Sequence, residues 1–165
     1  MSVQRYGEWH EWPFEPIEVL RAFGRHEVDY VLLGGLAAVL QGSPLPTYDI
    51  DLAPAPRVGN DVRLQAALTD LGAVRLGTAD TGTCAVDITS DQRFYSPSGY
   101  IDLHPRPTGF ATYAAVRRNA LLLELEPGLA VLVSPVRDII RSRIAAGDER
   151  QFPALEAVLD HETFP

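Results

Sequence analysis

Apolar positions along this chain follow two periods, one typical of helices and one typical of strands. Helical spacing predicts helices over 15–26, 36–41, 61–71, 110–116, 134–147 and 152–161. Short apolar or alternating runs predict strands over 28–33, 47–52, 84–88, 92–95, 100–104, 120–125 and 129–133. Because strands and helices are interleaved and hairpin turns join several strands, the pattern predicts an α+β fold with helices packed on a mixed β-sheet.

Local signals predict where two of these helices begin and which side chains they bury. Asn60 and Ser134 stand before apolar helical runs and are expected N-caps, and Gly147 is an expected stop. Val62 and Ile144 fall at apolar positions of their helices, so both side chains are expected on buried faces.

The length of the chain predicts one domain. With 165 residues the chain can bury a sizeable core, and it contains no repeat, low-complexity tract or linker. We therefore expect a single domain over 1–165, with an N-terminal extension over 1–14 and C-terminal helices within 134–165.

The strand predicted over 47–52 carries two aspartates one residue apart. Residues i and i+2 of a strand point to the same face, so Asp49 and Asp51 are expected to project together. Ile50 and Leu52 would then point into the core. Two carboxylates on one face can hold a divalent cation, and a D-x-D pair alone is a weak signal.

A third carboxylate is expected to complete a metal site. Asp102 alternates with Ile101 and Leu103 and so belongs to the polar face of its strand, where it can ligate a metal or act as a general base. Asp87 has the same apolar neighbours and is the second candidate. The expected cofactor is Mg²⁺ or Mn²⁺, which prefer oxygen ligands.

Two glycines end the apolar run before these aspartates. Without Cβ atoms, Gly34 and Gly35 let the backbone approach a phosphate chain, towards which the N–H groups of the next helix would point. Ser43 and Thr47 can add hydroxyl hydrogen bonds to phosphate oxygens. The order glycine pair, short helix and D-x-D favours a site for phosphoryl or nucleotidyl transfer.

Charge and composition narrow the partners. The net charge is −8, which argues against non-specific DNA binding, and all 14 basic residues are arginine, which excludes lysine-based mechanisms. No apolar run approaches the roughly 20 residues of a membrane span. The lone cysteine, Cys84, and the absence of a signal-like start predict a cytoplasmic protein that does not contact membranes.

These motifs resemble the nucleotidyltransferase fold of the DNA polymerase β superfamily, and most closely its AbiEii-type and small toxin–antitoxin relatives. The resemblance lies in Leu32-Leu33-Gly34-Gly35-Leu36-Ala37, in Thr47-Tyr48-Asp49-Ile50-Asp51-Leu52 and in Gly99-Tyr100-Ile101-Asp102-Leu103. It implies Asp49, Asp51 and Asp102 as catalytic metal ligands. A serine–lysine pair of the relatives falls on Ser142-Arg143, which implies Arg143 as a further phosphate ligand.

The resemblance implies a metal-dependent nucleotidyltransferase that moves a nucleoside monophosphate from an NTP to a hydroxyl of RNA, protein or a small molecule. It also implies a cognate toxin or antitoxin as a partner. The alternative is a weakened or inactive module that binds a nucleotide or a protein, because Leu45, Arg143 and Gln151 differ from the family pattern. A D-x-D glycosyltransferase is less compatible, because the glycine pair lies upstream of the aspartates.

Overall fold

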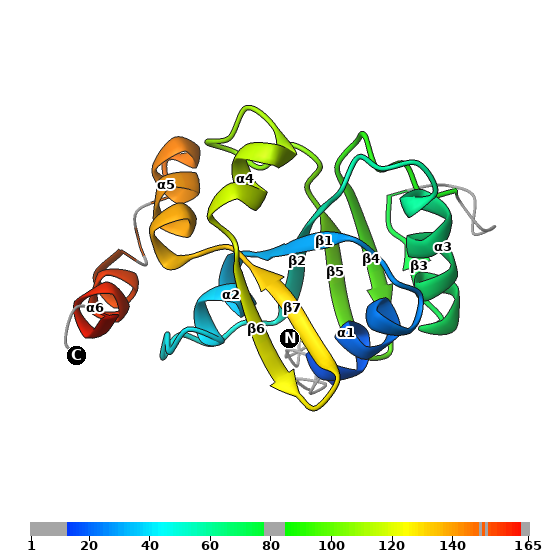
Figure 1. The fold of residues 1–165 in the computed structure, drawn as a ribbon, viewed down its shortest axis with the longest axis horizontal. Helices are drawn as coiled ribbons and strands as arrows, with labels where there is room; N and C mark the ends of the chain where they lie inside the picture. The colour runs from blue at the N-terminus through cyan, green and yellow to red at the C-terminus, as the bar shows by residue number, and fades with distance from the viewer. Residues whose placement is uncertain (1–12, 78–84, 149, 151, 163–165) are drawn as a thin grey trace, which may run out of the picture.

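A mixed β-sheet forms the middle of the molecule, and helices lie on its faces and beyond its ends (Figure 1). The computed structural model describes residues 13–77, 85–148, 150 and 152–162. In this part of the chain the elements are α1 (Pro16–Arg25), β1 (Tyr30–Leu33), α2 (Gly34–Val39), β2 (Asp49–Pro54), α3 (Asn60–Asp70), β3 (Val74–Arg75), β4 (Gln92–Ser96), β5 (Gly99–Leu103), α4 (Tyr113–Asn119), β6 (Leu121–Glu126), β7 (Leu129–Val133), α5 (Val136–Ala146) and α6 (Phe152–Glu162).

The order of strands in the sheet is β3-β4-β5-β2-β1-β7-β6. Neighbouring strands are antiparallel except for two parallel pairs, β2 with β5 and β1 with β7. The parallel pairs join segments that are distant in sequence, while antiparallel pairs of consecutive strands form both ends of the sheet. The predicted α+β class and mixed sheet are therefore confirmed.

Alternation along the central strands separates two apolar clusters. Leu32, Ile50 and Leu52 belong to the main core, which also contains apolar side chains of α1, α2 and α3. Val31 and Ala53 belong to a smaller cluster with Val116 of α4. Because successive side chains of a strand point to opposite faces, these clusters lie on opposite faces of the sheet.

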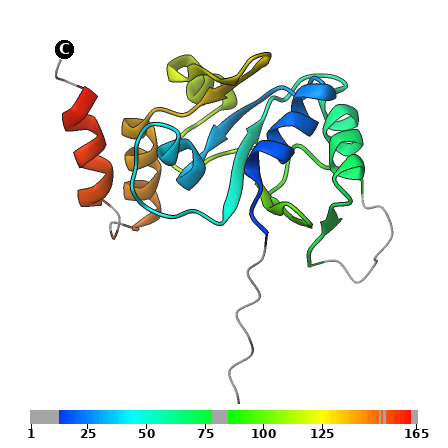
Figure 2. The ribbon, with the colours of Figure 1, turned by 90° about the horizontal axis from the view of Figure 1, so that it is seen from below.

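Helices cover the sheet unevenly. Figures 1 and 2 show α5 and α6 together at one end of the molecule, with α6 outermost, and α1 and α3 packed together near the other end. Leu155 and Val158 of α6 are buried against the main core, so α6 belongs to the same folded unit. No helix in the described part of the chain combines the length and apolar character needed to cross a membrane.

Several predictions about local elements are wrong. Residues 85–88 form a loop rather than a strand, because the Asp87 carboxylate accepts hydrogen bonds from the Thr89 backbone and hydroxyl and closes a turn. The two-residue strand β3 was not predicted. The helix expected over 36–41 begins at Gly34, and the one expected over 110–116 is α4, capped by the Thr112 side chain.

Neither Asn60 nor Ser134 is the N-cap of the helix that it was predicted to cap. The cap of α3 is Gly59, while the Asn60 side chain is buried and bonded to backbone groups of Asp29 and Ala55. The cap of α5 is Pro135, and the buried Ser134 instead extends the pairing of β7 with β1. Gly147 does end α5, in the left-handed conformation.

Two side chains expected on buried helix faces are exposed. Val62 is 68% exposed, because α3 buries the opposite side of the helix, which contains Leu64, Ala67 and Leu68. Ile144 is 56% exposed, because α5 buries only its first turns. Most of the N-terminal extension lies outside the described residues, but Phe14 packs on the main core.

Candidate metal centre

Three carboxylates meet on adjacent strands in the middle of the sheet. Asp49 and Asp51 lie on β2, and Asp102 lies on β5 directly opposite Asp51 in the parallel register. One carboxylate oxygen of each lies within 4.8 Å of the others. The alternation that buries Ile50 and Ile101 on the other face is what turns all three acids to this side.

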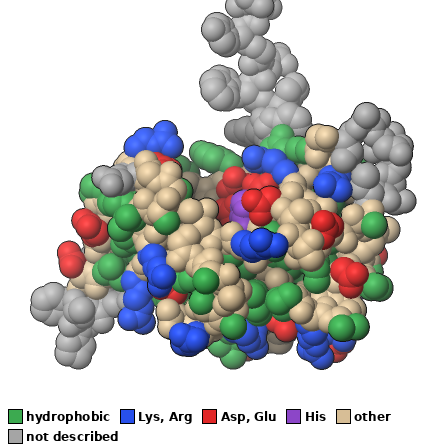
Figure 3. Space-filling view, turned by 90° about the horizontal axis from the view of Figure 1, so that it is seen from above, with side chains coloured by type: hydrophobic (Ala, Val, Ile, Leu, Met, Phe, Trp, Pro, Cys, Tyr) green, Lys and Arg blue, Asp and Glu red, His purple; other side chains and the backbone are tan. Residues whose placement is uncertain are grey.

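The group opens to solvent at one end. The exposed fraction of the side chain is 39% for Asp49, 21% for Asp51 and 10% for Asp102. In Figure 3 acidic side chains gather around a histidine, with arginine side chains beside them. A ligand would therefore reach the group from the Asp49 side.

Burial and the charges of neighbouring carboxylates favour the protonated forms of Asp102 and Asp49. Burial, opposed by Arg93 and helped by the charges of Asp51 and Asp49, raises the pKa of Asp102 to about 6. The pKa of Asp49 is raised by burial and then by Asp51. When these carboxylates are ionised, their negative charges repel one another. A bound divalent cation would supply positive charge that offsets this repulsion.

Arg93 of β4 is the guanidinium nearest to this group. Its Nε lies 3.5 Å from Asp102 Oδ1 and its Nη2 lies 3.8 Å from Asp49 Oδ2, while the guanidinium stacks over the Tyr100 ring. Arg93 is not among the site residues predicted from the sequence. Its signal was the hairpin turn at 97–98, whose pairing of Ser96 with Gly99 places Arg93 opposite Asp102.

His104 follows β5 and also faces the acids. Its Nε2 lies 3.1 Å from Asp51 Oδ1, and its Nδ1 lies 4.0 Å from Asp91 Oδ1. The hydrogen bond with Asp51 raises the pKa of His104, while burial lowers it. His104 therefore orients the Asp51 carboxylate.

The glycine pair lies against the site. A Cβ on Gly34, whose φ is +61°, would lie 2.1 Å from Asp51 Oδ2, and one on Gly35 would lie 2.7 Å from Thr47 Oγ1. Only glycine lets the first turn of α2 approach β2 this closely. The pair thus brings backbone groups directly beside one of the three carboxylates.

Two hollows adjoin Asp51. One, of about 200 Å³, contains Gly34, His104 and Ser142, and the other, of about 250 Å³, contains Ser43, Thr47 and Asp49. Arg143 of α5 lines both, and its Nη1 lies 3.3 Å from Asp148 Oδ2. The structure thus brings the expected hydroxyls and Arg143 to the carboxylates.

The polar residues of the second hollow already have local partners. Ser43 Oγ accepts a hydrogen bond from the Leu45 backbone at 3.3 Å, and Thr47 Oγ1 donates to the Asp49 carbonyl at 3.4 Å. Both contacts are long, so either hydroxyl can turn to a ligand. Asp87, the second candidate for the third ligand, does not belong to the carboxylate group in the described residues.

No family model and no curated protein matches this chain. The likeness to the nucleotidyltransferase superfamily therefore rests on the motifs at 32–52 and 99–103.

Proposed function

We propose that this protein has the nucleotidyltransferase fold and transfers a nucleoside monophosphate from an NTP to a hydroxyl acceptor on RNA, a protein or a small molecule. The observation that carries the proposal is the group formed by Asp49, Asp51 and Asp102 beside the Gly34–Gly35 backbone. Acidic groups often occur without an ion, so the adjoining hollows and the glycine pair are needed as support.

The donor set fits a hard divalent cation. Three carboxylate oxygens within reach of one another are ligands that Mg²⁺ and Mn²⁺ prefer, and these ions retain several waters, so few protein ligands suffice. Asp49, Asp51 and Asp102 would hold the ion. A bound ion would polarise the reacting phosphate and offset charge on the departing pyrophosphate.

The surrounding residues have roles that follow from their places. Ser43, Thr47 and Arg143 line the hollow next to Asp49 and Asp51, so we assign them to the phosphate oxygens. The planar guanidinium of Arg143 suits a bidentate phosphate contact. Asp102 can also accept the proton of the attacking hydroxyl as a general base.

The test is transfer of label from α-³²P-NTPs in the presence of Mg²⁺ to total RNA and to lysate proteins. We expect labelling by the wild type and at least a hundredfold less by Asp49→Asn, the scale of losing a key catalytic contact. Asp87→Asn, which removes an exposed carboxylate outside the group, should label like the wild type. Equal labelling by wild type and Asp49→Asn would refute the enzyme proposal.

One observation favours a second candidate, a module that binds nucleotide or a partner without turnover. The Arg93 guanidinium already lies against two of the three carboxylates and competes with a cation. Calorimetry with ATP or CTP discriminates between the two: binding that needs no Mg²⁺, together with no labelling, supports the module. If the resemblance to toxins holds, expression should arrest growth and Asp49→Asn should relieve the arrest.

A further inference from the structure

A second cavity lies between two strands that separate. β1 and β7 are joined by the single pair Leu32 with Val133, and towards their N-terminal ends they diverge (Figure 1). A cavity of about 520 Å³ lies in this gap, between Asp29–Tyr30 on one side and Leu129–Leu132 on the other. Its volume is within the range of small-molecule sites, roughly 300 to 1,000 Å³.

This cavity is separate from the carboxylate group. In the β1–β2 register, Leu33 is opposite Asp51 while Tyr30 is opposite Pro54, so the cavity adjoins the other end of β1. Three residues of strand separate the two places by about 10 Å. An inference about the cavity therefore does not rest on the proposed function.

One part of the lining is apolar. Leu20 of α1 and Val131 of β7 are buried there, and Leu122 of the edge strand β6 is 69% exposed at the cavity. Covering this exposed leucine with the apolar part of a ligand is favourable, because burial of apolar area lowers the free energy. The apolar side thus suits the body of an organic molecule.

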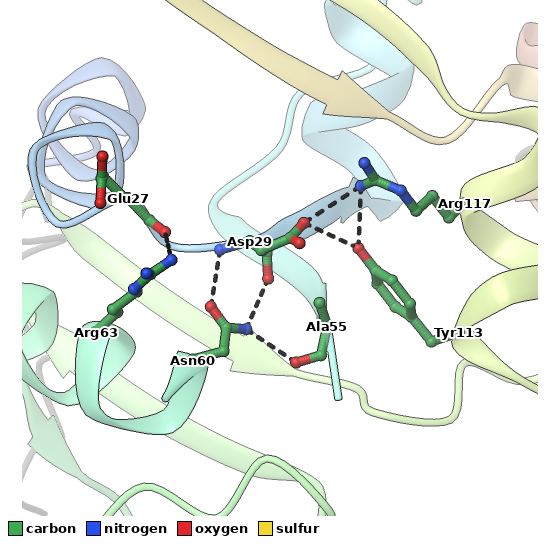
Figure 4. Close-up of polar contacts among 7 residues, drawn as sticks. All are labelled: Glu27, Asp29, Ala55, Asn60, Arg63, Tyr113 and Arg117. Atoms are coloured by element: carbon green, nitrogen blue, oxygen red, sulfur yellow. Dashed lines mark hydrogen bonds and ion pairs between the residues drawn. The ribbon is translucent and has the colours of Figure 1, made fainter. Parts of the chain in front are cut away.

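The other part carries three arginines, Arg57, Arg63 and Arg117. Figure 4 shows how two are held: Arg63 Nη1 donates to the Glu27 carbonyl at 3.2 Å, and Arg117 Nη1 to Asp29 Oδ1 at 3.2 Å. Each guanidinium has five N–H donors, so most of its donors stay available to a ligand. Arg57 is exposed and has no side-chain partner among the described residues.

A network of hydrogen bonds fixes the acid that holds Arg117. The Asn60 amide pairs with both backbone groups of Asp29, each at 2.8 Å, and the Tyr113 hydroxyl donates to Asp29 Oδ1 at 3.3 Å (Figure 4). Because Asp29 cannot move freely, its partner Arg117 is also held in place. Such preorganisation lowers the entropy lost on binding.

The charge balance at the cavity is positive although the chain is acidic. Three arginines line it together with two acids, Glu27 and Asp29, which leaves one positive charge in excess. In Figure 4 the Glu27 carboxylate points away from Arg63, which binds the Glu27 carbonyl instead. The excess charge is therefore available to an anion, and guanidinium groups fit planar or tetrahedral oxyanions.

We propose that this cavity binds an organic anion, with its phosphate or carboxylate among the arginines that line one part of it and its apolar body against Leu122 and Val131. Phosphate and carboxylate share the recognition chemistry, so matched probes with one apolar body can separate them. Suitable probes are 1-naphthyl phosphate and 1-naphthoate, with 1-naphthol and inorganic phosphate as the two halves of the ligand.

The experiment is an NMR titration of the ¹⁵N-labelled full chain with each probe, in EDTA so that no divalent cation bridges a probe to the carboxylates. We expect shifts for backbone amides around Tyr30 and Val131 with one or both naphthyl anions, and binding at least tenfold weaker with either half. The naphthyl anion that binds more tightly shows whether the cavity prefers a phosphate or a carboxylate.

Variants locate the site. Arg57→Glu should weaken binding about tenfold or more, because it replaces a bidentate donor by a like charge. Arg137→Glu, an exposed position of α5 away from the cavity, should leave binding unchanged. Leu122→Ser should also weaken binding, whereas Leu121→Ser on the same strand should not, since Leu121 does not line the cavity.

Each other outcome overturns the proposal. Equal affinity for 1-naphthol means an apolar patch only, and equal affinity for inorganic phosphate means an ion site without a place for the body. No shift at the cavity with either naphthyl anion excludes the site. Asp49→Asn should bind the probes as the wild type does, so failure of this proposal and failure of the metal centre are distinguishable.

Discussion

A β-carbon on Gly34 would lie 2.1 Å from the Oδ2 atom of Asp51, far inside contact distance. The same glycine has φ +61°, a conformation that costs a residue with a side chain about 1 to 2 kcal/mol. Two separate constraints therefore require glycine here, one from the backbone and one from the carboxylate beside it.

Gly34→Ala should destabilise the fold by more than backbone strain alone and should displace the Asp51 carboxylate. The control is Gly128→Ala in the β6–β7 turn, where φ is +83° and nothing lies within 4 Å of the new Cβ. We expect Gly128→Ala to cost about 1 to 2 kcal/mol in urea unfolding and Gly34→Ala roughly 1 to 3 kcal/mol more. Equal losses in the free energy of unfolding would show that the Asp51 side chain moves away from the new Cβ without a further loss of stability.

Arg93→Gln should strengthen binding of Mn²⁺ at pH 8, where the carboxylates are ionised. A positive charge within 4 Å of Asp49 and Asp102 repels an incoming cation, so its removal should tighten binding by roughly threefold or more. Titration followed by electron paramagnetic resonance measures free Mn²⁺. Arg118→Gln, at an exposed position of α4, should leave the affinity unchanged, and a weaker Arg93→Gln site would show that Arg93 supports the metal ligands instead.

The carboxylate pair could be predicted because the information is local. Strand alternation alone puts Asp49 and Asp51 on one face, and it correctly assigns Ile50 and Leu52 to the core. Asp102 needed a pairing between distant strands, which its apolar neighbours Ile101 and Leu103 indicated but could not specify. The residues are together as expected, while their chemical roles stay predictions.

Other features depend on packing that the sequence does not encode locally. The polar side chain of Asn60 looked like a helix cap, yet its amide is buried between two segments that meet only in the fold. Asp87 has the same apolar neighbours as Asp102, but its carboxylate accepts hydrogen bonds from the hydroxyls of Thr89 and Ser90 and lies in a turn. Arg93 belongs to no motif, and only the hairpin register set by the short turn at 97–98 places it opposite Asp102.

In the absence of divalent cations, the stability of the wild type relative to Asp102→Asn should fall as pH rises from about 4 to about 6. Burial raises the pKa of Asp102 from 3.8 to about 6, so the folded state binds this proton more tightly than the unfolded chain. The stabilisation by this bound proton is fully present below the pKa of the unfolded chain and is lost as the pH rises through the folded pKa. The loss is about 1.4 kcal/mol for each pH unit between the two pKa values. Urea unfolding from pH 4 to 7.5 measures it.

The control for this pH dependence is Asp102→Asn. The variant keeps the shape but cannot ionise, so it should match the wild type near pH 4 and exceed it in stability near pH 7. Millimolar Mg²⁺ at pH 7 should stabilise the wild type and not the variant, because ligand binding to the folded state adds stability. A wild type whose stability does not fall relative to the variant would contradict the raised pKa.

Glu27 is the single non-glycine residue with positive φ in the described chain, at +53°. It follows the C-terminus of α1, where its N–H bonds to the Gly24 carbonyl and the Val28 N–H bonds to the Phe23 carbonyl. This is the arrangement that usually ends with glycine. Its carbonyl in turn holds Arg63 at the cavity between β1 and β7.

Glu27→Gly should therefore stabilise the fold by about 0.5 to 1 kcal/mol, because the relief of left-handed strain exceeds the extra flexibility of the unfolded chain. Glu27→Ala is the matched control: it also removes the carboxylate but keeps the Cβ, so it should give no such gain. Both variants retain the carbonyl that holds Arg63, and both remove a negative charge from the cavity, so each should bind 1-naphthyl phosphate slightly more tightly. Urea unfolding and the NMR titration measure the two effects independently. If Glu27→Gly is no more stable than Glu27→Ala, the strain at this turn is already offset. Any gain over the wild type then cannot be assigned to the positive φ.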